Sequence, residues 1–552
     1  MRTILMLLFS ASVAVSAQPP APAAKPSAII RGRILGINGR AARRASVRIL
    51  APTGGIPRNA VADADGRYEF RNVEAGDYRI SASKPGFLVL EYGQQRAFEH
   101  GTVVTIKNGE TIENVDITLP GGGAISGRVM DAHGDPVEGV SMVLMQMQFA
   151  ANRRRLLPVA GVGRRLTNDQ GQYRLYSVPP GQYVIMAALT NQRGAQGSVV
   201  LPSGYAPTYA PDTPNPAGAR VVTVGLSAQI DDVNVMLAQV ATSRIAGTVV
   251  DAFGKPLRAR LLMSRSQRSG SVTMEEPAVD FSDADGGFEI RNVPAGDWVL
   301  QVSTGGDVNQ GQEGEFVSRF VTVSGTDVTD LHLQSSVGSR IEGRIVFEGN
   351  GTGDATGVTV TPLPSDFDLA PFVGPWGRGT GRVDGTFTLN GLHGPRRLSL
   401  MRAPTPWMLK AIRVNGRDVT DEPLSFGTKD ESLADVEVVL TSTAPGITGR
   451  VTGARGEVVA DYTVIVFATA ADRWYQGSRF LNFTRPKADG SFAVANLPPG
   501  DYYVAAVDRL QGTEGAGEWQ DPAFLESIAL RATRLTLNDG QQPSVTLRRI
   551  VR

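Results

Sequence analysis

Residues 65–80 read DGRYEFRNVEAGDYRI, and this stretch decides the fold class. Asp65-Gly66 supplies the positive-φ conformation that a tight turn requires. Tyr68 and Phe70 then alternate with charged residues, so both rings point to one face of a strand. The chain turns at Gly76, and a second alternating segment follows. The pattern therefore predicts two strands that share one core.

The same signature recurs along the chain at intervals of about 100 residues. An apolar strand with a central glycine precedes each copy; the five copies of this strand are 30–34, 125–129, 245–249, 341–345 and 447–451. In four units the turn glycine precedes the corner glycine by ten residues. The fourth unit departs, with Gly394 one residue early and Arg396 in place of the corner aromatic. An internal repeat of this length indicates a tandem array.

Each unit closes with one more alternating strand, as at 115–119 and 233–237. Short strands separated by turn signals at this spacing are typical of antiparallel β-sandwiches. Glycine (63) and proline (34) make up about 18% of the 552 residues, above the usual ~12%, which agrees with a turn-rich chain. Asn415-Gly416 predicts a tight hairpin, and residues 521–534 are a weak helical candidate. We expect an all-β chain of tandem antiparallel sandwiches.

The repeats and the N-terminal composition divide the chain into seven predicted parts. They are a signal peptide at 1–17, a Pro/Ala tether at 18–27, and sandwiches at 28–120, 121–240, 241–336, 337–443 and 444–552. The second sandwich carries a Pro/Tyr-rich insertion, and the fourth is the degenerate unit.

The N-terminus has the layout of a secretory signal peptide. Arg2 precedes an apolar run over residues 4–15, and Ala17 ends a small-residue cleavage site. The run is shorter than the ~20 residues of a membrane helix, although an uncleaved anchor is the alternative. We expect an exported protein, located in the periplasm, on the outer surface or outside the cell, with no membrane span after cleavage.

Charge and cysteine content exclude several classes of function. The net charge is +1, which gives no electrostatic basis for binding nucleic acid or an anionic membrane. The chain has no cysteine, so it has no disulfide, thiolate metal site, cysteine nucleophile or lipid-modified cysteine. Each sandwich must be stabilised by packing alone.

The glycine strand, the Asp-Gly turn and the Val-Pro-Pro-Gly-x-Tyr corner at 178–183 resemble carboxypeptidase regulatory-like domains. The resemblance implies transthyretin-like (prealbumin-like) sandwiches of about seven strands, within a group of carbohydrate-binding-like folds. It extends over nearly the whole mature chain and is weakest in the fourth unit. It does not imply carboxypeptidase activity, which belongs to a separate catalytic domain.

No catalytic or metal-binding motif stands out. The sequence has neither H-E-x-x-H nor G-x-S-x-G. Asp63-Ala64-Asp65-Gly66 and Asp283-Ala284-Asp285-Gly286 resemble the start of a calcium loop, but the later ligand positions do not continue the pattern. We expect β-turns there, no metal, no cofactor and no enzymatic activity.

Aromatic residues outside the core alternation are the candidate ligand-binding residues, because aromatic rings can stack on the apolar faces of sugars. They are Tyr205, Tyr209, Trp376, Trp474 and Tyr475. The alternative is that these rings pack over sheet edges or between domains.

Three hypotheses follow from the sequence. The first is a non-enzymatic structural or binding protein of the cell envelope, with polysaccharide as its candidate ligand. The second is an accessory module that contacts an envelope enzyme or transporter. The third is a hydrolase whose site no motif reveals. Polysaccharide and envelope proteins are thus the expected partners, and nucleic acid is not.

Overall fold

The structure is a computed structural model of the chain. It describes residues 28–550 except 52–56, 95–100, 151–152, 160, 190–203, 267, 269–277, 308–310, 350, 372–375, 454, 458–461, 488, 509, 511 and 514–515. The expected signal peptide, its cleavage site at Ala17 and the tether lie outside the described residues. The chain divides into two compact units, residues 1–120 and 121–552.

The first unit holds one sandwich of two sheets. The first sheet contains β4 (Arg67–Val73), β1 (Ala28–Gly36), β8 (Thr111–Ile112) and β9 (Ile117–Leu119). The second contains β3 (Arg58–Val61), β2 (Ser46–Leu50), β5 (Gly76–Ser83), β6 (Leu90–Glu91) and β7 (Val104–Ile106). Tyr68, Phe70 and Ile80 are buried between the sheets, as the alternation predicts.

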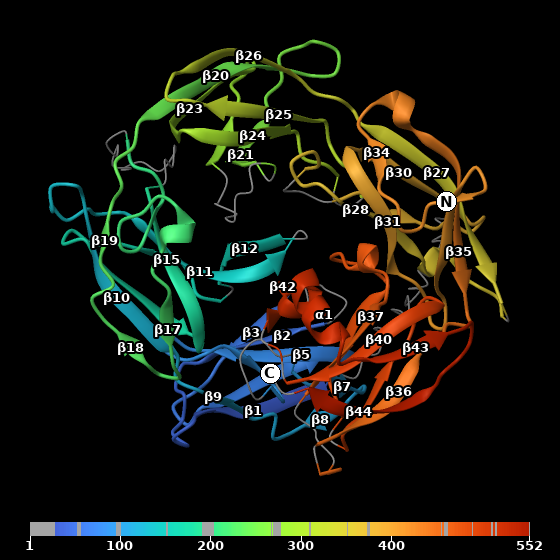
Figure 1. The fold of residues 1–552 in the computed structure, drawn as a ribbon. Coiled ribbons are helices and arrows are strands. Elements are labelled where there is room, and N and C mark those ends of the chain that lie inside the picture. Colours follow the sequence, from blue (N-terminus) through green and yellow to red (C-terminus); the bar gives the residue numbers. More distant parts are fainter. Residues whose placement is uncertain are drawn as a thin grey trace, which may run out of the picture. The chain divides into compact units, whose positions relative to one another are not determined.

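The second unit contains four further sandwiches (Figure 1). In the second sandwich, one sheet has β14 (Gln172–Val178), β10 (Gly123–Met130), β18 (Gln229–Ile230) and β19 (Val235–Met236). The other has β12 (Arg153–Pro158), β11 (Ser141–Ala150), β15 (Gly181–Ala188), β16 (Thr208–Tyr209), β13 (Arg165–Leu166) and β17 (Val222–Val224). In the third, β23 (Gly287–Pro294), β20 (Thr242–Val250) and β26 (Val328–Gln334) face β22 (Ala278–Phe281), β21 (Arg260–Arg265), β24 (Gly296–Ser303) and β25 (Phe316–Val323).

The fourth sandwich is the degenerate unit of the repeat and forms one side of the candidate site. Its first sheet has β30 (Thr386–Leu392), β27 (Ser339–Glu348), β35 (Leu433–Thr441), β32 (Met408–Val414) and β33 (Arg417–Asp418). Its second sheet has β29 (Gly379–Thr380), β28 (Thr359–Pro364), β31 (Gly394–Arg402) and β34 (Leu424–Phe426). The fifth is built from β38 (Leu481–Thr484), β37 (Thr463–Ala468), β40 (Gly500–Val507), β44 (Ser544–Ile550), β36 (Ile447–Thr452), β39 (Ser491–Val494) and β43 (Thr533–Leu537).

The sheets are not purely antiparallel. In every sandwich the closing strand runs parallel to the opening strand, as β9 does beside β1 and β44 beside β36. The remaining pairs are almost all antiparallel, so the all-β sandwich fold is confirmed with this refinement. The sandwich boundaries drawn from the sequence stay predictions.

The glycine of each opening strand makes room for the backbone of the closing strand. A Cβ atom built on any of these glycines would lie 2.0–2.4 Å from a carbonyl oxygen of the closing strand or of the residues that lead into it; the pairs are Gly32–Val115, Gly127–Val233, Gly247–Leu331, Gly343–Val436 and Gly449–Val545. No side chain fits at that distance, so the repeat requires glycine there.

In the first two sandwiches the aromatic residue of the turn signature is a tyrosine, and its hydroxyl bonds to the same carbonyl group. The hydroxyl of Tyr68 donates to the Val115 oxygen at 2.7 Å, and that of Tyr173 donates to the Val233 oxygen at 2.6 Å. Each hydroxyl is buried, so the bond satisfies a donor that would otherwise cost free energy in the core. The glycine leaves room for the closing strand, and the tyrosine bonds to it. Together these two residues hold the closing strand against the opening strand.

The corner aromatic has a similar role one strand later. Tyr183 and Tyr502 donate their hydroxyl hydrogens to the carbonyl oxygens of Pro179 and Pro498, at 2.8 and 2.6 Å. In the third sandwich the indole N–H of Trp298 donates to the Pro294 oxygen at 3.0 Å. A buried donor therefore closes the corner, whether it is a phenol or an indole.

Arg396 takes the place of this donor in the degenerate fourth unit. Its side chain is fully buried, and its Nε donates to the His393 carbonyl oxygen at 2.7 Å. Its Nη2 lies 2.7 Å from Oε2 of Glu313, a buried residue of the third sandwich. His393, also buried, donates from Nε2 to the Gly314 oxygen at 3.2 Å. The substitution thereby joins two sandwiches and fixes β31 at its start.

Two local predictions are confirmed. Asn415 and Gly416 have φ values of 52° and 78° and connect β32 to β33, as a tight hairpin requires. The helical candidate forms α1 (Pro522–Ala529), and the Asp521 carboxylate accepts a bond from the backbone N–H of Ala523 at its start.

We predict that Gly127→Ala destabilises the second sandwich by about 3 kcal/mol or more, because its Cβ would collide with the Val233 carbonyl. Gly225→Ala is the matched control in the same sandwich, since the nearest atom to its Cβ would lie 3.8 Å away. Hydrogen–deuterium exchange of peptides covering β10 and β14 measures the effect. Equal protection in the two variants would contradict the role assigned to Gly127.

We also predict that His393 makes the free energy of unfolding depend on pH. Burial lowers its pKa to about 4, below the ~6.5 of an unfolded chain. Between these values the unfolded state binds more protons, so the free energy of unfolding falls as the pH drops from about 6.5 to about 4, by up to ~1.4 kcal/mol per pH unit. Urea unfolding of the wild type and of His393→Gln should show a shallower pH slope for the variant; identical slopes would contradict the prediction.

Candidate functional site

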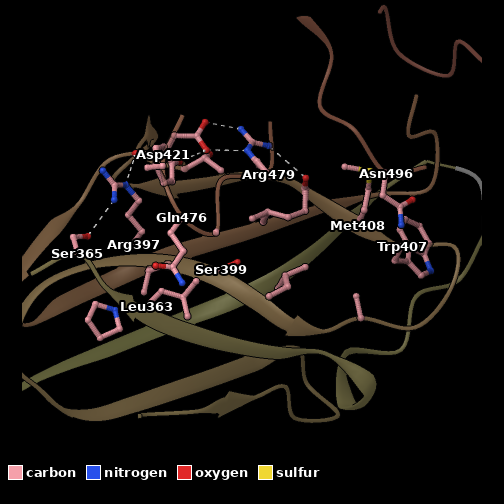
Figure 2. A pocket seen from close by; sticks show the side chains of 18 residues that line it. Leu363, Ser365, Arg397, Ser399, Trp407, Met408, Asp421, Gln476, Arg479 and Asn496 are labelled. Atoms are coloured by element: carbon pink, nitrogen blue, oxygen red, sulfur yellow. Dashed lines mark hydrogen bonds and ion pairs between the residues drawn. The ribbon is translucent and has the colours of Figure 1, made fainter. Parts of the chain in front are cut away.

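A cavity of about 310 Å³ lies between the fourth and fifth sandwiches (Figure 2). The fourth sandwich contributes residues of β28, β31 and β32, together with Asp421. The fifth contributes the segment 475–479 and Asn496. Gly477 has a φ of 81° and lies against β28, because a Cβ built on it would be 3.6 Å from Cδ1 of Leu363. The cavity is thus bounded by a sheet and by a loop seated on it.

An ion pair connects the two sandwiches at the rim of this cavity (Figure 2). Arg479 Nε lies 3.0 Å from Asp421 Oδ1, and Nη2 lies 2.9 Å from Oδ2. Arg479 Nη1 also donates to the Lys410 carbonyl oxygen at 2.9 Å. Two parallel bonds fix the orientation of both groups. The side chains are 23% and 29% exposed, so water still reaches the pair.

A stacked pair lies beside the ion pair. The guanidinium carbon of Arg397, on β31, is 4.1 Å from the ring centroid of Tyr475. Arg397 also donates to the Asp421 carbonyl oxygen at 3.1 Å and to the Ser365 hydroxyl at 3.4 Å. Burial raises the pKa of Tyr475, so its hydroxyl stays protonated at neutral pH. The arrangement offers a partly exposed aromatic ring next to a cationic fork.

A second hollow of about 480 Å³ adjoins the first on the outer face of the same sheet. Both hollows are lined by Leu363, Ser399 and Leu400, while Trp376 and Arg378 line only the second. The outward face of this sheet is apolar in part, since Leu363 is half-buried and Met401 is 57% exposed. We call the two hollows together the β28–β31 groove. Tyr475 borders one hollow and Trp376 borders the other.

The structure separates the five expected ligand-binding aromatics. Trp376 and Tyr475, which are 99 residues apart, both border the β28–β31 groove. Tyr205 is half-buried in the second sandwich, where its backbone pairs with Gln239. The indole N–H of Trp474 donates to the Ala468 oxygen at 2.7 Å, and its ring packs on Phe467.

Tyr209 requires a correction. The proline-rich insertion returns to the sheet as β16, and Tyr209 pairs with Met186 of β15. Its side chain is 0% exposed and belongs to the core of the second sandwich. A sugar cannot reach this ring in the folded state, so Tyr209 is a core residue.

The sequence did not single out Arg397 or Gln476. Arg397 follows the position where the corner aromatic is expected, and this irregularity is the signal that could have marked it. Gln476 extends from the loop of the fifth sandwich towards Leu363 and Ser399 (Figure 2). Both residues line the cavity only because the fourth and fifth sandwiches contact each other.

The acidic turns have a structural explanation. Oδ1 of Asp63 accepts the backbone N–H groups of Asp65 and Arg67, and Oδ1 of Asp283 does the same in the third sandwich. Among the residues that the structure describes, no three His, Cys, Asp or Glu side chains gather as metal ligands. That part of the chain has no helix with both the length and the apolar character needed to cross a membrane.

Residues 29–120 match the model of the carboxypeptidase regulatory-like domain. The first sandwich therefore belongs to that family, and the other four repeat its glycine strand and closing strand. No curated protein matches the chain.

Solved structures resemble the chain only distantly. The Bacillus anthracis TIE protein is 11% identical over 74% of this chain and 73% of its own, with a TM-score of 0.16. A streptococcal ancillary pilin is 13% identical over 56% and 99%, with a TM-score of 0.19. A putative carbohydrate binding protein from Pseudomonas aeruginosa is 15% identical over 17% and 89%, with a TM-score of 0.13.

We predict that Asp421 and Arg479 have a coupling free energy of about 1 kcal/mol in unfolding, because their ion pair is bidentate but partly exposed to water. Urea unfolding of Asp421→Asn, Arg479→Gln and the double variant completes the double-mutant cycle. The coupling should shrink in 1 M NaCl. The Arg417–Glu422 pair, exposed on the fourth sandwich, provides the control cycle, and a coupling no larger than the control would contradict the prediction.

Proposed function

We propose that this chain, whose first sandwich is a carboxypeptidase regulatory-like domain, is an exported, non-enzymatic binding and structural protein of the cell envelope. We place its ligand site in the β28–β31 groove, and we propose polysaccharide as the ligand class. The observation that carries the proposal is the pair of adjoining hollows with an aromatic ring beside each.

The groove has the elements that sugar binding needs. The rings of Tyr475 and Trp376 can bury the apolar C–H face of a sugar. Ser399 provides a hydroxyl between them for the sugar's own hydroxyl groups. The sheet of β28 and β31 is a rigid base, so the site needs little ordering when the ligand arrives.

The non-enzymatic part of the proposal is supported by the places of the histidines. His133, His332 and His393 lie in three different sandwiches, and His100 lies outside the described residues. His393 is buried beneath the joint of the third and fourth sandwiches, where burial keeps it neutral. The described histidines therefore cannot combine in one catalytic set.

Accessory contact with an envelope protein is the second candidate function. It is favoured by the exposed Met401 and the half-buried Leu363, because apolar side chains on the outer face of a sheet also suit a protein partner. It predicts protein binding that soluble polysaccharide does not displace.

We predict that Trp376→Ala and Tyr475→Ala each weaken polysaccharide binding about tenfold, equal to ~1.4 kcal/mol, because each removes a stacking ring. A glycan array with the full mature chain identifies the ligand, and titration calorimetry with that ligand measures the loss.

Tyr205→Ala is the matched control, since Tyr205 lies in the second sandwich and lines neither hollow. It should bind as the wild type does. If Tyr205→Ala alone lost binding, the insertion of the second sandwich would be the site. If the wild type retained no polysaccharide, the proposed ligand class would be wrong.

A further inference from the structure

The β28–β31 groove carries an excess of positive charge. Arg397, Arg479 and Arg378 line it, and Asp421 is the one carboxylate among the described residues of its lining. Asp421 is neutralised by Arg479 through two bonds. Arg397 and Arg378 thus remain as cations without a matching anion in the groove.

The guanidinium of Arg397 is fixed in orientation and has no anionic partner in the described part of the structure, so it can bind an anionic group. Its partners are the carbonyl oxygen of Asp421, the hydroxyl of Ser365 and the ring of Tyr475, none of which carries a full negative charge. Among the ion pairs of the described part of the chain, Arg397 forms none. Stacking and hydrogen bonds fix the plane of its guanidinium, which lowers the entropy lost on binding.

Arg378 provides the second cation. It is exposed beside Trp376 and, like Arg397, forms no ion pair with a described residue. Each hollow therefore combines a partly exposed aromatic ring with one unneutralised arginine, and the buried Trp407 also lines the first hollow. The stretch of β31 from Arg397 to Met401 measures about 13 Å at ~3.3 Å per residue, which leaves room for a short run of sugar rings.

We infer that the ligand of the groove is an acidic polysaccharide whose sugars carry carboxylates. This inference rests on the proposed function and names its substrate class. A ring stacks on Tyr475 or Trp376, and a carboxylate on the sugar accepts a forked pair of hydrogen bonds from Arg397 or Arg378. Alternation of rings and charges along the chain of sugars would match the two hollows.

The test uses the full mature chain with polygalacturonate and alginate, each compared with its carboxyl-reduced form. Reduction converts the carboxylates to primary alcohols and leaves the sugar rings in place. We expect the acidic polymers to bind at least tenfold more tightly at 50 mM NaCl, and the difference to shrink at 500 mM NaCl. Arg397→Gln and Arg378→Gln should each reduce the difference three- to tenfold.

Arg402→Gln is the matched control, because Arg402 is exposed on the same strand but lines neither hollow. It removes the same charge and should bind as the wild type does. Equal loss in all three variants would show attraction by net charge alone and would overturn the assignment to the groove.

Two further outcomes separate this inference from the proposed function. Equal binding of the acidic and reduced polymers would overturn the choice of an acidic ligand while the polysaccharide site remained. Failure of every polysaccharide, on the array and in solution, would overturn both. Arg378→Gln serves as the second variant should Arg397→Gln disturb Tyr475.

Discussion

The approach of the closing strand to a glycine of the opening strand is the constraint on which each sandwich depends. A carbonyl oxygen occupies the space in which any side chain would begin, and it does so in all five sandwiches. In the first two a buried tyrosine bonds to that same oxygen. The first and last strands of a unit are thus joined in parallel, so the unit is closed without disulfides.

The donor at the corner can bond within its own sandwich or also to the preceding sandwich. A phenol or an indole satisfies one carbonyl within its own unit, as Tyr183 and Trp298 do. A guanidinium has further donors, and Nη2 of Arg396 reaches Glu313 in the preceding sandwich. Removing one partner would leave a charge buried alone, which costs about 3–5 kcal/mol. In the degenerate unit, the corner residue therefore also connects the fourth sandwich to the third, and β31 begins at this connection.

Features that depend on neighbours in the chain could be predicted from the sequence. The turn signature, the hairpin at Asn415-Gly416 and the helix after Asp521 all formed as expected. Tyr209 was misassigned because a proline-rich stretch looks like a surface loop until it pairs with β15. The sequence could identify Trp376 and Tyr475 individually as candidate ligand-binding residues. Only the contact of the fourth and fifth sandwiches brings them to one groove. The pairing of Arg396 with Glu313, over 83 residues, has no local signal.

The difference between the two joints of the fourth sandwich has a mechanical consequence. The third–fourth joint holds a dry ion pair, whereas water already reaches the pair of Asp421 and Arg479 at the fourth–fifth joint. A pulling force would meet the stronger resistance at the dry joint, because separation there strands a charge in a core. The fourth–fifth joint would yield first and carry Tyr475 away from Arg397. Tension across the fourth sandwich would in this way open the groove before it separates the third and fourth sandwiches.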